Sequence, residues 1–155
     1  GKGNMQKIIA VIGGSAASPQ ACQLAKRVGR AVAEAGAVLL TGGRGGIMEA
    51  ACEGCRQGGG LNLALLPGQG RGGANRFVDL ALPTDLGDAR NARVAGCGQA
   101  VIALEGGAGT LSEIALAVKR GVPVISLGGW QVTGVVEARG PEEAVSEALR
   151  LGSAT

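Results

Sequence analysis

Residues 7–36 read KIIAVIGGSAASPQACQLAKRVGRAVAEAG and contain one complete unit of strand, glycine turn and helix. The apolar run at 7–12 is typical of a strand that is covered on both faces. A glycine pair then predicts a turn, and Ser18 followed by Pro19 is typical of a helix N-cap and first helical position. Gly36 predicts the end of that helix. A buried strand followed by a helix is the repeating unit of α/β folds.

The same unit recurs along the rest of the chain. Further strands are expected at 38–41, 61–66, 77–82, 100–104 and 123–127, and further helices at 47–57, 88–97, 111–120 and from Pro141 onward. This alternation predicts an α/β, Rossmann-like, doubly wound and mostly parallel sheet with helices on both faces. No linker interrupts it, so residues 5–155 are expected to form one nucleotide-binding domain. The glycine-rich segment 67–76 is expected to be a mobile loop.

The composition excludes several classes of function. Thirty of the 155 residues are glycine, and there is no histidine, so zinc sites built on histidine and Ser-His-Asp nucleophile systems are excluded. One Trp, one Phe and no Tyr argue against nucleic-acid binding by base stacking. The net charge of +3 is too small to indicate a nucleic-acid or membrane partner. We therefore expect a small anionic ligand.

The cysteines and the chain ends bear on the compartment in which the protein works. Cys52 and Cys55 form a CxxC inside a predicted helix, without the second close pair that a zinc ribbon needs. They are expected to be small, partly buried thiols, and no metal site is expected. No apolar stretch is long enough to cross a bilayer. Residues 1–4 are interpreted as a cloning remnant rather than a signal peptide, which predicts a cytoplasmic protein.

Three glycine turns lie between a predicted strand and a predicted helix. They are GGS at 13–15, TGGRGG at 41–46 and GGAGT at 106–110. Such turns meet at the C-terminal edge of a parallel sheet, where glycine lets a ligand approach the backbone and the helix N-terminus attracts an anion. None matches a Walker A motif or the GxGxxG fingerprint. The expected phosphate- or ligand-binding residues are Gly13, Gly14, Ser15, Gly42, Gly43, Arg44, Gly45, Asn91, Gly106, Gly107, Gly109 and Thr110.

Two charged residues have competing interpretations. The string TLSE fits a capping box, with Thr110 as N-cap and Glu113 reaching back to its N–H. Arg90 shares a predicted helix face with Val94 and Cys97, and it is either a surface arginine or part of a site. The residue pattern alone leaves both questions open.

The strings TGGRGGIMEAA at 41–51 and EGGAGTLSEIALAVKRGVPVI at 105–125 carry a family resemblance. They resemble the superfamily of the cytokinin-activating phosphoribohydrolases, the LOG or "lonely guy" proteins, and of the molybdenum cofactor carrier proteins. Members were once labelled as lysine decarboxylases. The likeness extends from about residue 7 to residue 127, and the first string is more similar to the carrier-like branch.

The resemblance implies a catalytic pair. In the phosphoribohydrolases an arginine and the glutamate of GGxGTxxE cleave a nucleoside 5′-monophosphate into base and ribose 5-phosphate, and these positions match Arg90 and Glu113. Two residues depart from the family pattern, because Glu105 replaces a proline and Ala108 replaces an aromatic residue. Glu105 is expected to place negative charge beside the phosphate cradle and to weaken anion binding.

These observations predict a binder or carrier of a phosphorylated, nucleotide-like ligand, similar to the molybdenum cofactor carriers. The alternative is a phosphoribohydrolase for nucleoside 5′-monophosphates, so enzymatic activity is left open. No cofactor is expected to be required, and the candidate ligands are a nucleotide or the molybdenum cofactor. Lysine decarboxylation is disfavoured, because Lys7, Lys26 and Lys119 lie at element edges or on polar helix faces.

A homodimer or homotetramer is also expected. Members of the family form such assemblies, and only 17% of the residues are charged. The helix predicted at 111–120 has a core stripe of Leu111, Ile114, Ala115 and Val118. Leu116 lies off that stripe and is the expected contact with a second subunit.

Overall fold

The computed structural model describes residues 5–153, so the interpretation of residues 1–4 lies outside the described residues. The strands are β1 (Ile8–Ile12), β2 (Val38–Thr41), β3 (Asn62–Leu66), β4 (Leu80–Pro83), β5 (Ala100–Ala103), β6 (Val124–Ser126) and β7 (Val136–Glu137). The helices are α1 (Pro19–Glu34), α2 (Ile47–Gln57), α3 (Arg90–Cys97), α4 (Ala108–Lys119) and α5 (Pro141–Gly152), with a 3-10 turn at Gly87–Ala89. None of these helices is long and apolar enough to cross a membrane.

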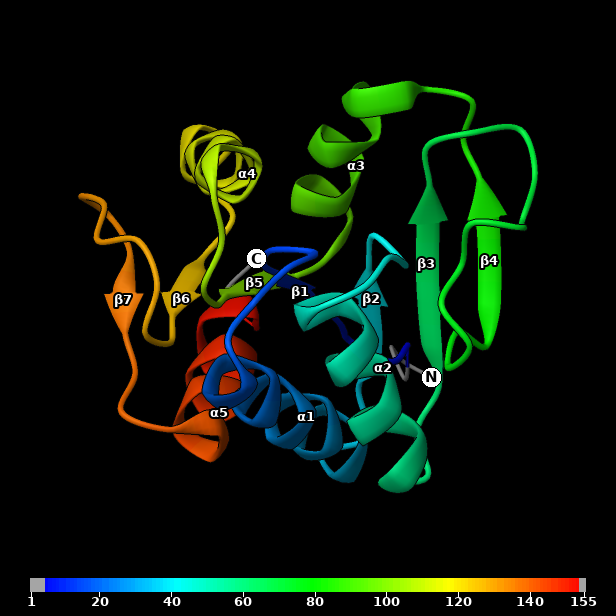
Figure 1. Cartoon of the computed structure of the whole chain (residues 1–155). Coiled ribbons are helices and arrows are strands. Elements are labelled where there is room, and N and C mark those ends of the chain that lie inside the picture. The colour runs from blue at the N-terminus through cyan, green and yellow to red at the C-terminus, as the bar shows by residue number, and fades with distance from the viewer. Residues whose placement is uncertain (1–4, 154–155) are drawn as a thin grey trace.

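The strands form one parallel sheet in the order β4-β3-β2-β1-β5-β6-β7. Helices α1, α2 and α5 cover one face, and α3 and α4 cover the other (Figure 1). Alternate residues of β1 enter the two cores, with Ile9 and Val11 on the α1 side and Ala10 and Ile12 on the α3 side. The predicted Rossmann-like α/β fold with helices on both faces is confirmed.

Helix α1 begins and ends where its sequence signals predict. Ser18 is the N-cap, and its hydroxyl accepts a hydrogen bond from the N–H of Ala21 at 3.1 Å. Pro19 opens the helix, and Gly36 follows its end with a φ of 78°. These local signals suffice because each acts within one turn of the chain.

Two glycines allow α1 and α2 to pack closely. A Cβ at Gly29 would overlap the carbonyl oxygen of Ala51, and a Cβ at Gly54 would overlap that of Lys26. Helix α2 also contains Cys52 and Cys55, which are expected to be partly buried. In the structure both are fully buried free thiols. Burial raises the pKa of Cys55 to about 12, so this thiol is unreactive at neutral pH.

The strand expected at 77–82 begins later than predicted. Asn62 donates to the carbonyl of Phe77 at 2.9 Å and accepts from the N–H of Asp79 at 3.1 Å, so these side-chain bonds replace the strand ladder there. The strand β4 therefore starts at Leu80. Strand β7 was not predicted, because only two residues of an exposed segment pair with β6.

The segment 67–76 is a loop that is fixed at its C-terminal end. Asn75 donates its backbone N–H to Gly43 at 2.8 Å and its side-chain amide to the carbonyl of Arg44 at 2.8 Å. The C-terminal end of the loop is thus hydrogen-bonded to the second glycine turn.

Candidate functional site

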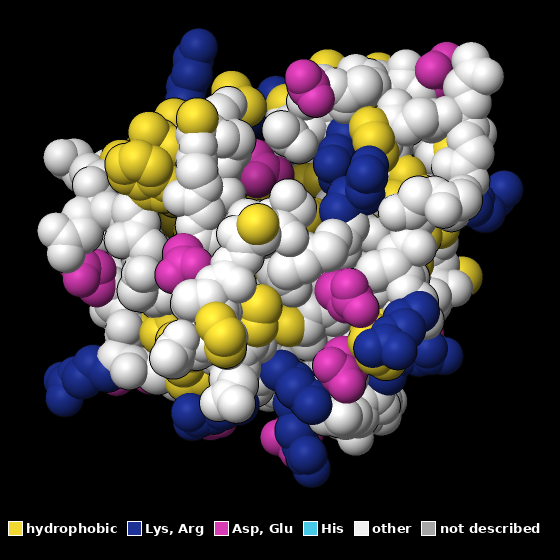
Figure 2. All heavy atoms as spheres, viewed as in Figure 1, with side chains coloured by type: hydrophobic (Ala, Val, Ile, Leu, Met, Phe, Trp, Pro, Cys, Tyr) yellow, Lys and Arg dark blue, Asp and Glu magenta, His cyan; other side chains and the backbone are white. Residues whose placement is uncertain are grey.

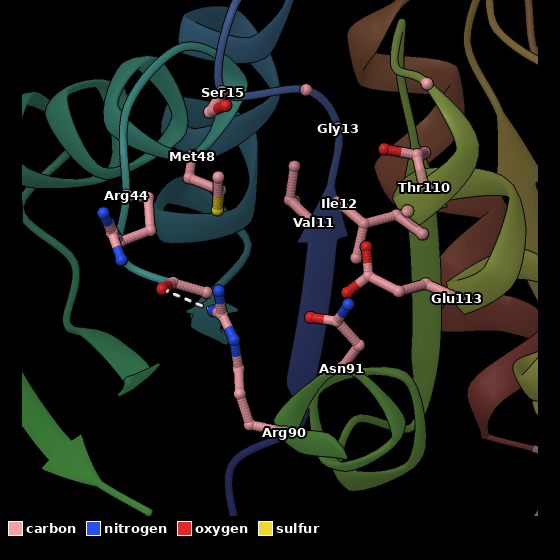
Figure 3. Close-up of a pocket in the computed structure, with 14 residues that line it drawn as sticks. Val11, Ile12, Gly13, Ser15, Arg44, Met48, Arg90, Asn91, Thr110 and Glu113 are labelled. Carbon is pink, nitrogen blue, oxygen red and sulfur yellow. Dashed lines mark hydrogen bonds between the residues drawn. The ribbon is translucent and has the colours of Figure 1, made fainter. Parts of the chain in front are cut away.

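A pocket of about 400 Å³ opens at the C-terminal edge of the sheet, where the three glycine turns meet (Figure 3). It lies beside the end of β1, between the second glycine turn and α2 on one side and α3 and α4 on the other. The lining residues are Val11, Ile12, Gly13, Gly14, Ser15, Gly42, Arg44, Met48, Arg90, Asn91, Gly107, Gly109, Thr110 and Glu113.

Three expected ligand-binding residues do not line the pocket. A Cβ at Gly43, whose φ is 76°, would meet Ala64 of β3 at 2.7 Å, so this glycine packs against the sheet. Gly106 lies against the side chain of Thr110, and Gly45 lies near the carbonyl of Ser15. These glycines shape the turns without facing the pocket.

Three lining residues were not predicted, namely Val11, Ile12 and Met48. The first two belong to the end of β1 and look in the sequence like ordinary core residues. Met48 is the second residue of α2, and its position directly after a glycine turn was the available signal. They add apolar groups to the lining of the pocket.

Arg90 is anchored at the pocket rather than solvated at the surface. Its Nη1 donates to the carbonyl of Gly42 at 2.7 Å and to that of Leu65 at 3.0 Å, whereas its buried Nε has no hydrogen-bond partner among residues 5–153. A Cβ at residue 42 would overlap the Nη1 of this guanidinium, so a larger residue there would displace Arg90 from its two carbonyl acceptors. Burial lowers the pKa of Arg90, with the neighbouring charge of Glu113 opposing that effect. The surface-arginine interpretation is therefore wrong.

Glu113 does not belong to a capping box. Helix α4 begins at Ala108 with Gly107 as its N-cap, three residues earlier than predicted, so Thr110 is the third helical residue. Gly107 has a non-helical backbone conformation, with φ −97° and ψ −149°, and its carbonyl accepts the first helical hydrogen bond from the N–H of Leu111 at 3.1 Å. The side chain of Glu113 instead enters the pocket.

The carboxyl group of Glu113 is half-buried and points toward the amide of Asn91 (Figure 3). Burial raises its pKa to about 7, and the positive charge of Arg90 partly opposes this rise. A carboxyl group with such a pKa is both proton donor and proton acceptor near neutral pH. Glu113 can therefore either hydrogen-bond a ligand in both senses or take part in proton transfer.

Positive charge predominates in the pocket. Arg44 is exposed and makes no ion pair among the described residues. Its positive charge contributes to lowering the pKa of Arg90. Figure 2 shows basic side chains facing an acidic one across a hollow between α3 and α4. Two arginines opposite one partly protonated carboxyl group favour an anionic ligand.

The N-terminal turn of α4 is open to such a ligand. A Cβ at Gly107 or at Gly109 would have no heavy atom within 4 Å. Trp130 lies on the β6–β7 connection, and its indole N–H donates to the carbonyl of Gly107 at 3.2 Å. The single tryptophan of the chain is thus attached to the turn that has free N–H groups.

Contrary to expectation, Glu105 is not among the residues that line the pocket. Its carboxylate turns toward α1, where it accepts hydrogen bonds from the N–H of Ser18 at 2.8 Å and from the hydroxyl of Ser18 at 3.2 Å. The helix N-terminus and the Ser18 hydroxyl attract the carboxylate away from the pocket.

Leu116 is also placed differently from the prediction. It is half-buried against the core formed with α3 and β5, whereas Ala115 is exposed. Among the described residues, exposed leucines gather instead near β4, at Leu80, Leu82 and Leu86.

We expect Glu113→Gln to stabilise the fold above pH 7 and to change it little near pH 4. The pKa of about 7 lies above the ordinary value of 4.5, so the folded chain holds this proton more tightly than the unfolded chain. Wild-type stability therefore falls as pH rises from 4.5 through 7, by on the order of 1–3 kcal/mol, and the neutral glutamine escapes this loss. Urea unfolding of both chains at pH 4 and pH 8 measures the difference. An equal effect at both pH values would contradict the assigned burial.

The fold is that of a Rossmann-like α/β protein, with a pocket at the C-terminal edge of its sheet that is lined by two arginines and one glutamate. Within that class, the chain belongs to the SLOG cluster4 family, whose model matches residues 6–151. An uncharacterized protein of Archaeoglobus fulgidus is 42% identical over 139 residues, which cover 89% of this chain and 91% of the relative.

Solved structures agree with this assignment. The molybdenum cofactor binding protein of Rippkaea orientalis is 35% identical with a TM-score of 0.90, and the match covers 96% of this chain and 99% of that chain. The molybdenum cofactor carrier protein of Chlamydomonas reinhardtii is 29% identical with a TM-score of 0.85, with the same coverage. The chain is therefore similar to carrier proteins over nearly its whole length.

Proposed function

We propose that this chain binds a small phosphorylated, nucleotide-like ligand in the pocket and acts as its binder or carrier. The observation that carries the proposal is the open N-terminal turn of α4, which lines the same pocket as Arg44 and Arg90. Free N–H groups at a helix N-terminus and arginine side chains both bind phosphate. The names of the structural relatives support a carrier role.

The phosphate is proposed to bind to the backbone N–H groups of residues 107–110, with the Thr110 hydroxyl nearby. Both glycines of this turn leave open space, and Gly107 and Gly109 line the pocket. Arg44 carries no competing ion pair in the described part of the chain, so its guanidinium is free to bind an anionic ligand from the other side of the pocket.

The rest of the pocket fits a planar ring with polar edges. Val11 and Met48 line the side toward α2, whereas Ile12 lies on the opposite side, where Asn91 and Glu113 offer hydrogen bonds. The molybdenum cofactor, a phosphorylated pterin, is compatible with these groups. No cysteine or histidine lines the pocket, so these residues would hold the organic part of the cofactor while the metal kept its own sulfur ligands.

The second candidate is hydrolysis of a nucleoside 5′-monophosphate, and the pKa of Glu113 near 7 favours it. Water would add to C1′ of the ribose as the glycosidic bond breaks, giving free base and ribose 5-phosphate. The carboxylate of Glu113 would take a proton from the water and stabilise positive charge at C1′, and the departing base would take up a proton, from the Glu113 carboxyl group or from solvent, as the C1′–N bond breaks. Arg90 would hold the phosphate or the leaving base.

Titration of the purified chain with 5′-AMP and with adenosine tests the proposal. Because the indole N–H of Trp130 is hydrogen-bonded to the carbonyl of Gly107, its fluorescence should change when phosphate binds to the N-terminal turn of α4. We expect 5′-AMP to bind and adenosine to bind far more weakly. Equal affinity for the two compounds would contradict a phosphate site.

Prolonged incubation with 5′-AMP, followed by chromatography, separates the two candidate functions. Intact 5′-AMP supports the binder. Release of adenine that is lost in Glu113→Gln supports the phosphoribohydrolase instead.

We further propose that the chain is a single nucleotide-binding domain that assembles as a homodimer or homotetramer. The exposed apolar residues near β4 are compatible with a subunit contact. Light scattering at micromolar concentration tests this assembly, and a mass near 15.2 kDa would contradict it.

A further inference from the structure

Glu105 connects two of the glycine turns through its backbone and its side chain. Its carbonyl accepts the N–H of Gly14 at 2.8 Å, and its carboxylate accepts the N–H and hydroxyl of Ser18. The three bonds span the β1–α1 loop, residues 13–18, which supplies Gly14 and Ser15 to the pocket. The loop is therefore fixed near both of its ends by a single residue that lies about 90 positions away in the chain.

Gly14 extends this connection to the second glycine turn, residues 41–46. Its carbonyl accepts the N–H of Ile47, the first residue of α2, at 3.0 Å. The peptide groups on either side of Gly14 thus join the β5–α4 turn to the β2–α2 turn. A displacement of the β1–α1 loop would be transmitted to both.

Glu105 also occupies the N-terminus of α1. Its carboxylate already accepts the Ser18 N–H, and the Ser18 hydroxyl accepts from Ala21. A second anion there would meet a like charge and an N–H that is already bonded. In contrast, the N-terminal turn of α4 contains open glycines.

We propose that Glu105 is a positioning residue that holds the β1–α1 loop and directs the ligand's phosphate to α4 rather than α1. This inference rests on the proposed phosphate site. The expectation from charge alone was that Glu105 weakens anion binding, whereas a positioning role means that Glu105 strengthens it. If the negative charge acted directly on the ligand, removing it would tighten binding, whereas loss of a positioning contact weakens binding.

Glu105→Ala tests the proposal, with Glu143→Ala as the matched control. Glu143 is likewise exposed and accepts a backbone N–H at a helix start, from Arg139 at 2.9 Å, but it does not line the pocket. In Glu105→Ala we expect amide hydrogen exchange of residues 14–18 to become about tenfold faster. We also expect the affinity for 5′-AMP to fall about fivefold.

A conservative variant and chemical rescue separate positioning from general destabilisation. Glu105→Gln retains an oxygen that accepts the Ser18 N–H, so its affinity should stay within about twofold of wild type. Added formate should restore part of the affinity of Glu105→Ala, by supplying a carboxylate to Ser18, and should leave Glu143→Ala unchanged.

The possible failures are distinguishable. Unchanged exchange at residues 14–18 in Glu105→Ala, or an affinity equal to or tighter than wild type, would overturn the role of Glu105. Failure of the wild-type chain to bind any phosphorylated ligand would instead overturn the proposed function, whereas the exchange measurement needs no ligand.

Discussion

Gly109→Asp is expected to lower the affinity for 5′-AMP by about 100-fold or more without loss of stability. Gly109 lies in the first turn of α4 and lines the pocket, and a Cβ there meets no heavy atom within 4 Å. The added carboxylate would face the phosphate, and two such charges about 4 Å apart repel by about 4 kcal/mol at an effective dielectric of 20. An acidic residue in a first helical turn itself stabilises the helix by about 0.3–1 kcal/mol.

Gly109→Asn is the matched control, because it adds the same volume without the charge. Its affinity should lie well above that of Gly109→Asp, and the thermal midpoints of the two variants should be at or near that of wild type. Titrations by tryptophan fluorescence measure both variants. Equal affinities of wild type and Gly109→Asp would show that the phosphate binds elsewhere.

Gly54→Ala is expected to reduce the free energy of unfolding by about 3 kcal/mol or to prevent folding. Its Cβ would overlap the carbonyl oxygen of Lys26 and would lie 3.1 Å from the N of Arg30, so α1 and α2 would have to separate. Backbone atoms cannot rotate away as a side chain can. The better helix propensity of alanine, about 1 kcal/mol, does not offset this clash.

Gly96→Ala serves as the control, since Gly96 is also a helical glycine. The nearest atoms to a Cβ there would all belong to the flexible side chain of Arg120, with its Nη1 closest at 2.6 Å. Urea unfolding should place this variant within about 1 kcal/mol of wild type. Similar stabilities for Gly54→Ala and wild type would contradict the close packing of the two helices.

The parts of the fold that depend on neighbouring residues were predictable from the sequence. Helix α1 follows from Ser18, Pro19 and Gly36, and α2 occupies the predicted range of 47–57. The apolar run of β1 correctly indicated a strand buried on both faces. The predicted start of β4 was wrong, because the true start depends on hydrogen bonds between Asn62 and Asp79, which lie 17 residues apart.

The position of the pocket at the edge of the sheet was predictable from the sequence, whereas the orientation of its side chains was not. Parallel strands bring glycine turns to one edge by topology, so Gly14, Gly42 and Gly107 could be placed together in advance. The anchoring of Arg90 on two backbone carbonyls depends on contacts across 48 and 25 residues. The orientation of Glu105 likewise depends on Ser18, 87 residues away. Residue spacing carries no information about such contacts.

An NMR titration of the ¹⁵N-labelled chain with 5′-AMP tests the central claim most directly. The proposed site predicts that the largest shifts of amide signals occur at residues 107–110, with smaller shifts at Gly14 and Gly42. Adenosine at the same concentration should leave the signals of 107–110 in place. Saturating 5′-AMP that moves other amide signals and not these, or that moves none, would contradict a phosphate site at the N-terminus of α4.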